Sequence, residues 1–118
     1  MLGSSPAVFE IVTGQILLAR RHDFLRCHRE LLLPMLLAAN IEPVLCLLTE
    51  LGRHGRFVDI YRYPSLEEYG KRTDEFLRDT RLPDYYAQVG TCIEGSISVE
   101  LALEFPHFLG TNRLGSST

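Results

Sequence analysis

The stretch Gly55–Arg72, GRFVDIYRYPSLEEYGKR, decides the fold of this chain. Its first half predicts a strand in which Val58 and Ile60 occupy one face. Because successive strand side chains point to opposite faces, the other face carries three aromatic residues and one carboxylate, namely Phe57, Asp59, Tyr61 and Tyr63. Asp is depleted in strand centres. Two interpretations of Asp59 therefore stand side by side, a solvated edge residue or a pocket-lining acid or base.

The second half of the same stretch predicts a helix over residues 66–79. Pro64 ends the strand because it cannot donate a hydrogen bond to a neighbouring strand. Ser65 and Glu68 have the spacing of a capping box, which satisfies the free N–H groups at a helix start. Before this stretch, residues 41–51 predict a partner strand, and the short connection 52–55 joins the two strands as a hairpin.

Residues 20–40 change to a helical period. An apolar stripe recurs at helical spacing and consists of Phe24, His28, Leu31 or Leu32, and Met35. Pro34 lies inside this pattern, so the helix should kink there or lose its regular geometry. Asn40 is expected to be the C-terminal cap, since Asn tolerates the left-handed conformation.

Two further strands are predicted near the ends of the chain. Residues 8–18 are rich in strand-forming residues, and Gly14 marks a bulge or a close approach. Residues 91–105 alternate strictly, and we expect the apolar members to face a core. These are Ile93, Ile97, Val99 and Leu101. Residues 81–90 are expected to be a connector.

The order strand, helix, strand, strand, helix, strand predicts an α+β fold. It is the ferredoxin-like βαββαβ arrangement, with a four-stranded antiparallel sheet and both helices on one face. The other sheet face would be bare in a monomer, so we expect a homodimer that forms a dimeric α+β barrel. We expect a flexible leader over residues 1–7, one domain over 8–105 and a tail over 106–118.

Composition excludes several classes of function. The net charge of −3 argues against nucleic-acid binding, which needs clustered cations. No signal peptide is evident, and the longest apolar segment, Leu31–Ala39, is too short to span a membrane, so a cytoplasmic protein is expected. The thiols Cys27, Cys46 and Cys92 form no CxxC pair and are expected to be reduced and mostly buried. Neither a metal site nor a cofactor is indicated.

These elements resemble a known family. The order of strands and helices, LLP at Leu32–Pro34, TELG at Thr49–Gly52 and FVDIYRYPSLEE at Phe57–Glu68 are similar to the NIPSNAP-like branch of the dimeric α+β barrel superfamily. The family usually opens with a strand reading roughly E-L-R-T-Y, whereas this chain has Glu10–Gly14, EIVTG. The resemblance implies a pocket between sheet and helices. The wider superfamily includes cofactor-free monooxygenases, polyketide cyclases, isomerases and haem-handling enzymes.

Two residues are candidate catalytic groups. Asp59 is one, and His28 is the other because it lies in the apolar stripe of the first helix and should point at the sheet. His28 is either a core histidine or a general base. If the helix packs across the sheet, the two side chains could meet, and the carboxylate would orient the imidazole.

Aromatic residues are the candidate substrate-binding groups. A tyrosine offers a large apolar face and one hydroxyl, which suits the binding of a ring. The candidates are Phe24, Tyr61, Tyr63, Tyr85 and Tyr86. For Tyr63, core filling is the favoured interpretation.

These observations predict a cofactor-independent enzyme that acts on a small hydrophobic, polyketide-like molecule in secondary metabolism, by cyclisation or isomerisation. A pocket with few ionisable groups mainly shapes and desolvates its substrate, and a single base then suffices. Two alternatives stay open. One is a non-catalytic module that binds a hydrophobic ligand, and the other is a cofactor-free oxygenase or a haem-binding protein with His28 as the axial ligand.

Overall fold

The computed structural model describes residues 6–106. Its strands are β1 (Val8–Ile16), β2 (Glu42–Leu48), β3 (Arg56–Tyr63) and β4 (Ile93–Leu103). Its helices are α1 (Arg21–Cys27), α2 (Leu33–Ala38), α3 (Leu66–Leu77) and α4 (Leu82–Val89), with short turns of other helix types at Leu18–Arg20, His28–Leu32 and Gly90–Cys92. Residues 1–5 of the expected leader and residues 107–118 of the expected tail lie outside the described part.

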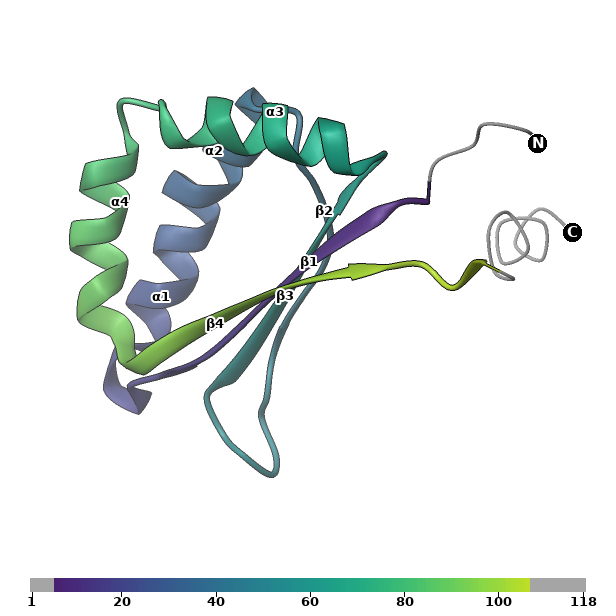
Figure 1. The fold of residues 1–118 in the computed structure, drawn as a ribbon. Helices are drawn as coiled ribbons and strands as arrows, with labels where there is room; N and C mark the ends of the chain where they lie inside the picture. Colours follow the sequence, from purple (N-terminus) through teal and green to yellow (C-terminus); the bar gives the residue numbers. More distant parts are fainter. Residues whose placement is uncertain (1–5, 107–118) are drawn as a thin grey trace, which may run out of the picture.

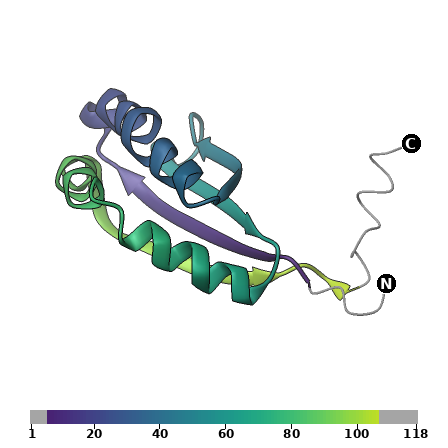
Figure 2. The same ribbon diagram turned by 90° about the horizontal axis from the view of Figure 1, so that it is seen from above.

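The four strands form one antiparallel sheet in the order β2-β3-β1-β4. All helices lie on one face of this sheet, with α1 and α2 beside α3 and α4 (Figures 1 and 2). This arrangement confirms the α+β, ferredoxin-like βαββαβ fold. On β3, Phe57, Asp59, Tyr61 and Tyr63 are buried, whereas Val58 and Ile60 are only half-buried on the opposite face.

The first helical segment shows the expected effect of its proline. Helix α1 is regular, the next turn at His28–Leu32 is π-helical, and α2 then begins with Pro34 in its first turn. A proline ring clashes with the carbonyl four residues earlier, and the wider turn relieves this clash. Asn40 has a φ of 59° and ends the segment, as predicted for a left-handed cap.

The prediction for the second helical segment was correct for α3 and wrong for the connector. The Ser65 hydroxyl accepts a hydrogen bond of 3.1 Å from the Glu68 N–H and caps α3. Residues 82–89, expected to belong to a connector, form helix α4 instead. Pro83 lies in the first turn of α4, where its missing N–H has no intrahelical partner to lose. Leu82 and Val89, seven residues apart, are both buried, which is a helical spacing.

Gly14 combines the two features predicted for it. The pairing of β1 with β4 shifts its register between Thr13 and Gln15, which is a bulge. A β-carbon at Gly14 would also lie 2.7 Å from the ring of Phe57 on the neighbouring strand. The Phe57 ring in turn packs against Phe24, with ring centroids 4.9 Å apart. Because Gly14 has no side chain, the rings of Phe57 and Phe24 can pack closely against the sheet at this position.

We expect Gly14→Ala to destabilise the protein by about 1–3 kcal/mol, because the added methyl group forces the Phe57 ring out of place. Urea unfolding followed by circular dichroism measures the change. Gly70→Ala is the matched control, since the space around Gly70 in α3 is open, and it should stabilise the helix by about 0.5–1 kcal/mol. Equal effects of the two substitutions would contradict the close approach at Gly14.

The apolar residues of strand β4 are more exposed than the sequence predicted. Its pairing with β1 aligns Val99 with Val12 and Leu101 with Glu10, so these odd positions share the face that carries the helices. They are nevertheless exposed, with 54% of Val99 and 45% of Leu101 accessible to solvent. Val99 lines a cavity between the sheet and the helices and does not pack directly against a helix. The expectation that these residues are buried in a core was therefore wrong for the single chain.

The thiols also differ from the prediction at one position. Cys27 and Cys92 are buried, as expected, but Cys46 is exposed. Cys46 lies on β2, an edge strand of the sheet. An edge strand has a neighbour on one side only, and its residues are therefore less covered.

No helix in residues 6–106 is long and apolar enough to cross a membrane.

Candidate functional site

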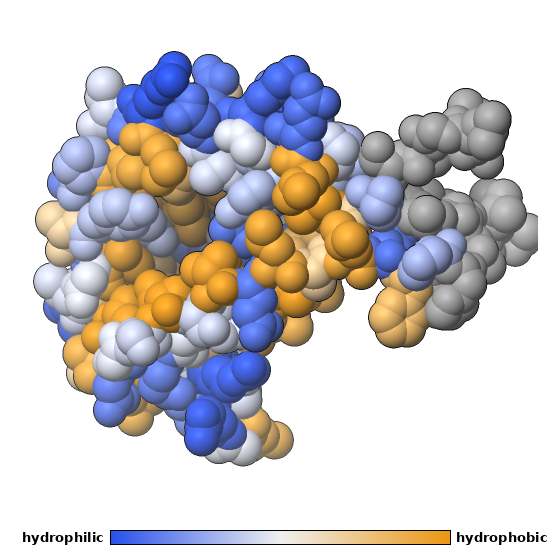
Figure 3. Space-filling view, viewed as in Figure 1, coloured by the Kyte–Doolittle hydropathy of each residue, from blue (hydrophilic) through white to orange (hydrophobic). Residues whose placement is uncertain are grey.

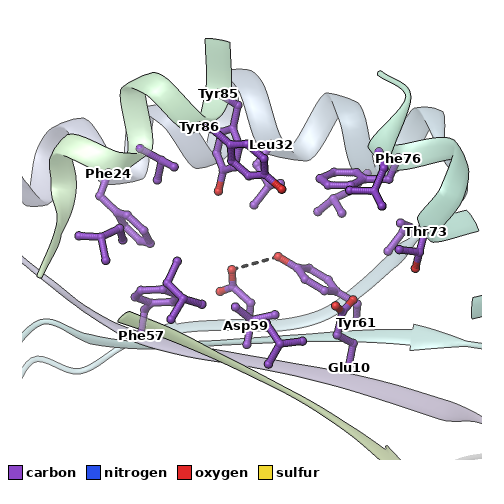
Figure 4. A pocket seen from close by; sticks show the side chains of 18 of the residues that line it. Glu10, Phe24, Leu32, Phe57, Asp59, Tyr61, Thr73, Phe76, Tyr85 and Tyr86 are labelled. Atoms are coloured by element: carbon purple, nitrogen blue, oxygen red, sulfur yellow. Dashed lines mark hydrogen bonds between the residues drawn. The ribbon is translucent and has the colours of Figure 1, made fainter. Parts of the chain in front are cut away.

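A cavity of about 280 Å³ lies between the sheet and the helices. Hydrophobic residues dominate the surface around its opening (Figure 3). Figure 4 shows Phe24 and Phe57 at one end, Thr73 and Phe76 at the other, and Asp59 in the floor between them. Strands β1, β3 and β4 supply the floor, and helices from both groups supply the walls. Among the residues that line it, none is Lys, Arg or His.

Within residues 6–106, Asp59 is the only buried residue with an ionisable side chain apart from the thiols and the tyrosines, with 5% of its surface exposed. Its Oδ2 atom accepts a hydrogen bond of 3.0 Å from the Tyr61 hydroxyl. Burial raises the pKa of Asp59, and the neighbouring His28 and the hydrogen bonds from Tyr61 and Cys46 offset part of that rise. Burial and the adjacent carboxylate also raise the pKa of Tyr61, so its hydroxyl stays protonated as a donor. Asp59 is therefore a pocket-lining residue and not a solvated edge residue.

His28 lies close to Asp59 but does not line the cavity. Its Nε2 atom is 3.8 Å from Asp59 Oδ2, which is longer than a hydrogen bond. The same Nε2 atom is buried and has no hydrogen-bond partner in the described part of the chain. The structure therefore brings together the two predicted catalytic residues, but His28 does not line the cavity. His28 can act on a bound molecule only through Asp59.

Cys46 completes a small cluster with these two residues. The ligand atoms of His28, Cys46 and Asp59 all lie within 4.8 Å of one another. A zinc ion would need them roughly 3.5 Å apart, given its bond lengths of about 2.0–2.3 Å. The Cys46 thiol and the Asp59 carboxyl group would also have to lose their protons. Partial burial of the Cys46 sulfur and the neighbouring Asp59 charge raise the pKa of this thiol to about 12, although the residue as a whole is exposed. The expectation that the protein works without a metal therefore stays a prediction.

A second carboxyl group lines the cavity and was not singled out from the sequence. Glu10 on β1 accepts a hydrogen bond of 2.8 Å from the Tyr63 hydroxyl, and burial raises the pKa of Glu10. Val8, Glu10 and Val12 alternate along β1 on one face, which is the signal that could have identified Glu10. Tyr63 is 1% exposed, in agreement with its favoured interpretation as a core residue. It also contacts the cavity through its position in the wall.

The other predicted aromatic residues all line the cavity as well. Phe24 is buried, Tyr85 is half-buried and Tyr86 is exposed. Both tyrosines come from α4, and their ring centroids lie 5.9 Å apart. Burial raises the pKa of Tyr85, which keeps this hydroxyl neutral. Together these residues form an aromatic wall, with Tyr85 and Tyr86 opposite Asp59 and Phe24 at one end of the cavity (Figure 4).

Neither a protein-family model nor a curated protein matches the chain. Solved structures do match. A NIPSNAP family protein from Agrobacterium tumefaciens has a TM-score of 0.76 and 17% sequence identity, over 86% of this chain and 89% of that one. An uncharacterized NIPSNAP-like domain protein from Burkholderia xenovorans has a TM-score of 0.74 and 12% identity, over 85% and 86% of the two chains.

The chain has the NIPSNAP fold. The resemblance stated from the sequence is thereby confirmed for the fold. A putative antibiotic biosynthesis monooxygenase from Bordetella bronchiseptica has a related fold, with a TM-score of 0.66 and 13% identity over 86% of this chain and 99% of that one. These likenesses show the fold alone, and any argument for function must come from the residues of the cavity.

Proposed function

We propose that this protein is a cofactor-independent enzyme that moves a proton on a small hydrophobic molecule, in a cyclisation or an isomerisation. The observation that carries this proposal is Asp59, a buried carboxyl group in the floor of an otherwise largely apolar cavity. A carboxylate without full hydration is a stronger base than one in water, because burial disfavours its charge. Removal of a proton from carbon is the step that such a base accelerates.

The geometry assigns a role to each neighbour of Asp59. Its carboxylate takes a proton from one carbon of the substrate. In an isomerisation it returns this proton to another carbon. In a cyclisation the carbanion attacks a carbonyl carbon of the same molecule, the C=O π bond breaks, and the proton returns to the new alkoxide oxygen, so neither reaction gains or loses a proton or an electron overall. Tyr61 holds the carboxyl group in place through its hydrogen bond. His28, when protonated, favours the ionised form of Asp59 and is therefore a positioning residue. The aromatic wall excludes water and holds the carbon skeleton.

A generic substrate can test whether Asp59 acts as a base, and this test does not require the natural substrate. Nitrobenzisoxazole is a small, uncharged ring. When a base removes its carbon-bound proton, the N–O bond breaks and the electron pair passes to a coloured phenolate. We expect saturable cleavage that is faster than with acetate at an equal concentration of carboxylate. The rate should rise with pH through the raised pKa of Asp59, because only the ionised form is a base. Cleavage no faster than acetate would refute the proposal.

A second candidate is a cofactor-free oxygenase, which the related fold of the putative monooxygenase favours. It would use the same base to form a substrate carbanion, and the carbanion would then react with dioxygen. Oxygen uptake with an electron-rich phenol distinguishes the two candidates. The haem-binding alternative has less support, because His28 faces Asp59 and does not line the cavity.

We further propose that the protein works as a homodimer joined through the sheet face without helices. Ile11 and Ile60 pair across β1 and β3 on that face, and Leu45 on β2 pairs with Ile60. Leu45 is 48% exposed and Leu47, two residues on, is 53% exposed. A contiguous apolar sheet face of this kind is typical of an interface, and a second copy offers the same face.

Light scattering should therefore report about twice the chain mass of 13.4 kDa at micromolar concentration. Ile60→Arg should shift the mass to that of one chain, because it places a charge in the proposed interface. Leu51→Arg is the control, since Leu51 lies in the β2–β3 loop with 90% of its surface exposed, and it should leave the dimer intact. A monomeric wild-type protein would contradict the dimer proposal.

A further inference from the structure

The cavity has a second polar region, at the end opposite Phe24 and Phe57 (Figure 4). Glu10 contributes a carboxyl group from β1, of which Oε1 already accepts the Tyr63 hydroxyl. Thr73 contributes a hydroxyl from α3, on the other side of the cavity. Thr73 Oγ1 lies beside the Tyr63 hydroxyl, yet it is buried and makes no hydrogen bond of normal geometry with the described residues.

A buried hydroxyl group without a partner is unfavourable, because it loses its hydrogen bonds to water and gains none in return. A bound molecule can supply what is missing. Glu10 offers acceptor lone pairs and Thr73 offers a donor. A ligand hydroxyl matches both at once, because it can donate to the carboxyl group and accept from the threonine.

The pairing of the strands sets the distance between this region and Asp59. Glu10 pairs directly with Tyr61, and Val12 pairs with Asp59. Glu10 and Asp59 are therefore diagonal neighbours on one face, with β-carbons about 7 Å apart. The cavity volume of about 280 Å³ equals that of roughly nine waters in the liquid. Both values suit a ligand about the size of one substituted ring.

The charges around the cavity select against anions. Two carboxyl groups line it, and no Lys, Arg or His does. An anionic ligand would have to shed its hydration without gaining a cationic partner, which is strongly unfavourable in an apolar site. Burial also raises the pKa of both carboxyl groups, which shows that the cavity disfavours added negative charge. A cation would have to leave water for a site that is otherwise largely apolar.

We propose that Glu10 and Thr73 bind a hydroxyl group of an uncharged, ring-sized ligand whose reacting carbon lies at Asp59. The ligand hydroxyl donates to Glu10 and accepts from Thr73, and Tyr63 holds the Glu10 carboxyl group in place. This assignment rests on the proposed function in one respect, namely that the cavity holds a small ligand. It adds the chemical class of that ligand and the residues that select it.

Four probes of similar size separate these requirements. They are para-hydroxyacetophenone, acetophenone, para-hydroxybenzoate and para-hydroxybenzylamine. Dissociation constants come from chemical shift changes in the isotope-labelled full-length protein at neutral pH. We expect para-hydroxyacetophenone to bind about five- to thirtyfold more tightly than acetophenone, which is the effect of one additional hydrogen bond. The benzoate and the benzylamine should each bind at least about tenfold more weakly than para-hydroxyacetophenone.

Two variants test the residues directly. Thr73→Val keeps the shape of the side chain and removes the hydroxyl, and Glu10→Gln keeps the shape and removes the acid. Thr73→Val should remove most of the preference for para-hydroxyacetophenone over acetophenone. Glu10→Gln should weaken it, because the neutral amide is a poorer acceptor than a carboxylate and has one acceptor oxygen in place of two. Acetophenone itself should bind to both variants as before. Thr13→Val is the matched control, because Thr13 pairs with Val58 on the sheet face away from the cavity. It should leave the preference unchanged.

An unchanged preference in both Thr73→Val and Glu10→Gln would overturn the proposal. Tighter binding of the benzoate or the benzylamine than of the neutral phenol would overturn the assignment of an uncharged ligand. Failure of all four probes at millimolar concentration would count against both this inference and the proposed function. A retained hydroxyl preference in a protein that does not cleave nitrobenzisoxazole would contradict the proposed function alone.

Discussion

Asp59→Asn should lower the rate of nitrobenzisoxazole cleavage by about 10²–10⁴-fold, the usual contribution of a general base. Asn keeps the shape of the side chain and can still accept the Tyr61 hydrogen bond, but it cannot take a proton at neutral pH. The residual rate should also lose the rise with pH that the wild-type protein shows. Asp74→Asn is the matched control, because Asp74 is an exposed residue of α3 that pairs with Arg78. Its rate should equal that of the wild type.

The same substitution should not weaken the fold. Burial raises the pKa of Asp59 above its usual value, so the native state binds a proton more tightly than the unfolded state does. As pH rises from the unfolded pKa to the folded one, the native state loses stability, and above that window the loss is complete. Asn carries no such charge, so Asp59→Asn should unfold at the same urea concentration as the wild type at pH 7, or at a higher one. A loss of about 1–3 kcal/mol together with full activity would show instead that Asp59 is structural.

Met35→Ala should lower the free energy of unfolding by about 2–5 kcal/mol. Met35 on α2 has no exposed surface and lies in the core cluster that contains Val8, Tyr63 and Leu82. Its truncation leaves a cavity among elements that are held in place by the sheet and by α4, so the gap can close only in part. Total stabilities of about 5–15 kcal/mol are usual, and this loss would be a large share.

Urea unfolding followed by circular dichroism provides the measurement for Met35→Ala. Leu37→Ala is the matched control, because Leu37 lies on the same helix with 60% of its surface exposed. It should change the free energy by less than about 0.5 kcal/mol. If the two variants lost equal stability, the assignment of Met35 to the centre of the core would be wrong.

Local sequence rules predicted several features correctly. The alternation along β3 identified the face of Asp59, and the positions of Pro34 and Asn40 indicated where the first helical segment changes and ends. Each of these rests on a stereochemical preference of a residue and its near neighbours. The one element that the rules missed is α4. Pro83 was taken as part of a connector, although a proline in the first helical turn is favourable.

The site itself required contacts between distant parts of the chain. Asp59 and His28 were both identified from the sequence, but their separation of 3.8 Å depends on how the first helical segment crosses the sheet. Glu10 was not singled out, because its environment comes from Tyr63, 53 residues away. The sequence also did not predict the exposure of β4, because alternation shows which residues share a face but not whether another element covers that face.

The residues that share a face could be assigned from the sequence, because side-chain direction follows from the backbone period of each strand or helix. Which faces meet and which stay open depends on how the helices pack on the sheet. Burial depends on the packing of all elements together. Burial raises the pKa of Asp59 and Glu10, and it leaves the Thr73 hydroxyl without a hydrogen bond of normal geometry among the described residues. For that reason the buried polar groups of the cavity could not be predicted before the packing of the helices on the sheet was known.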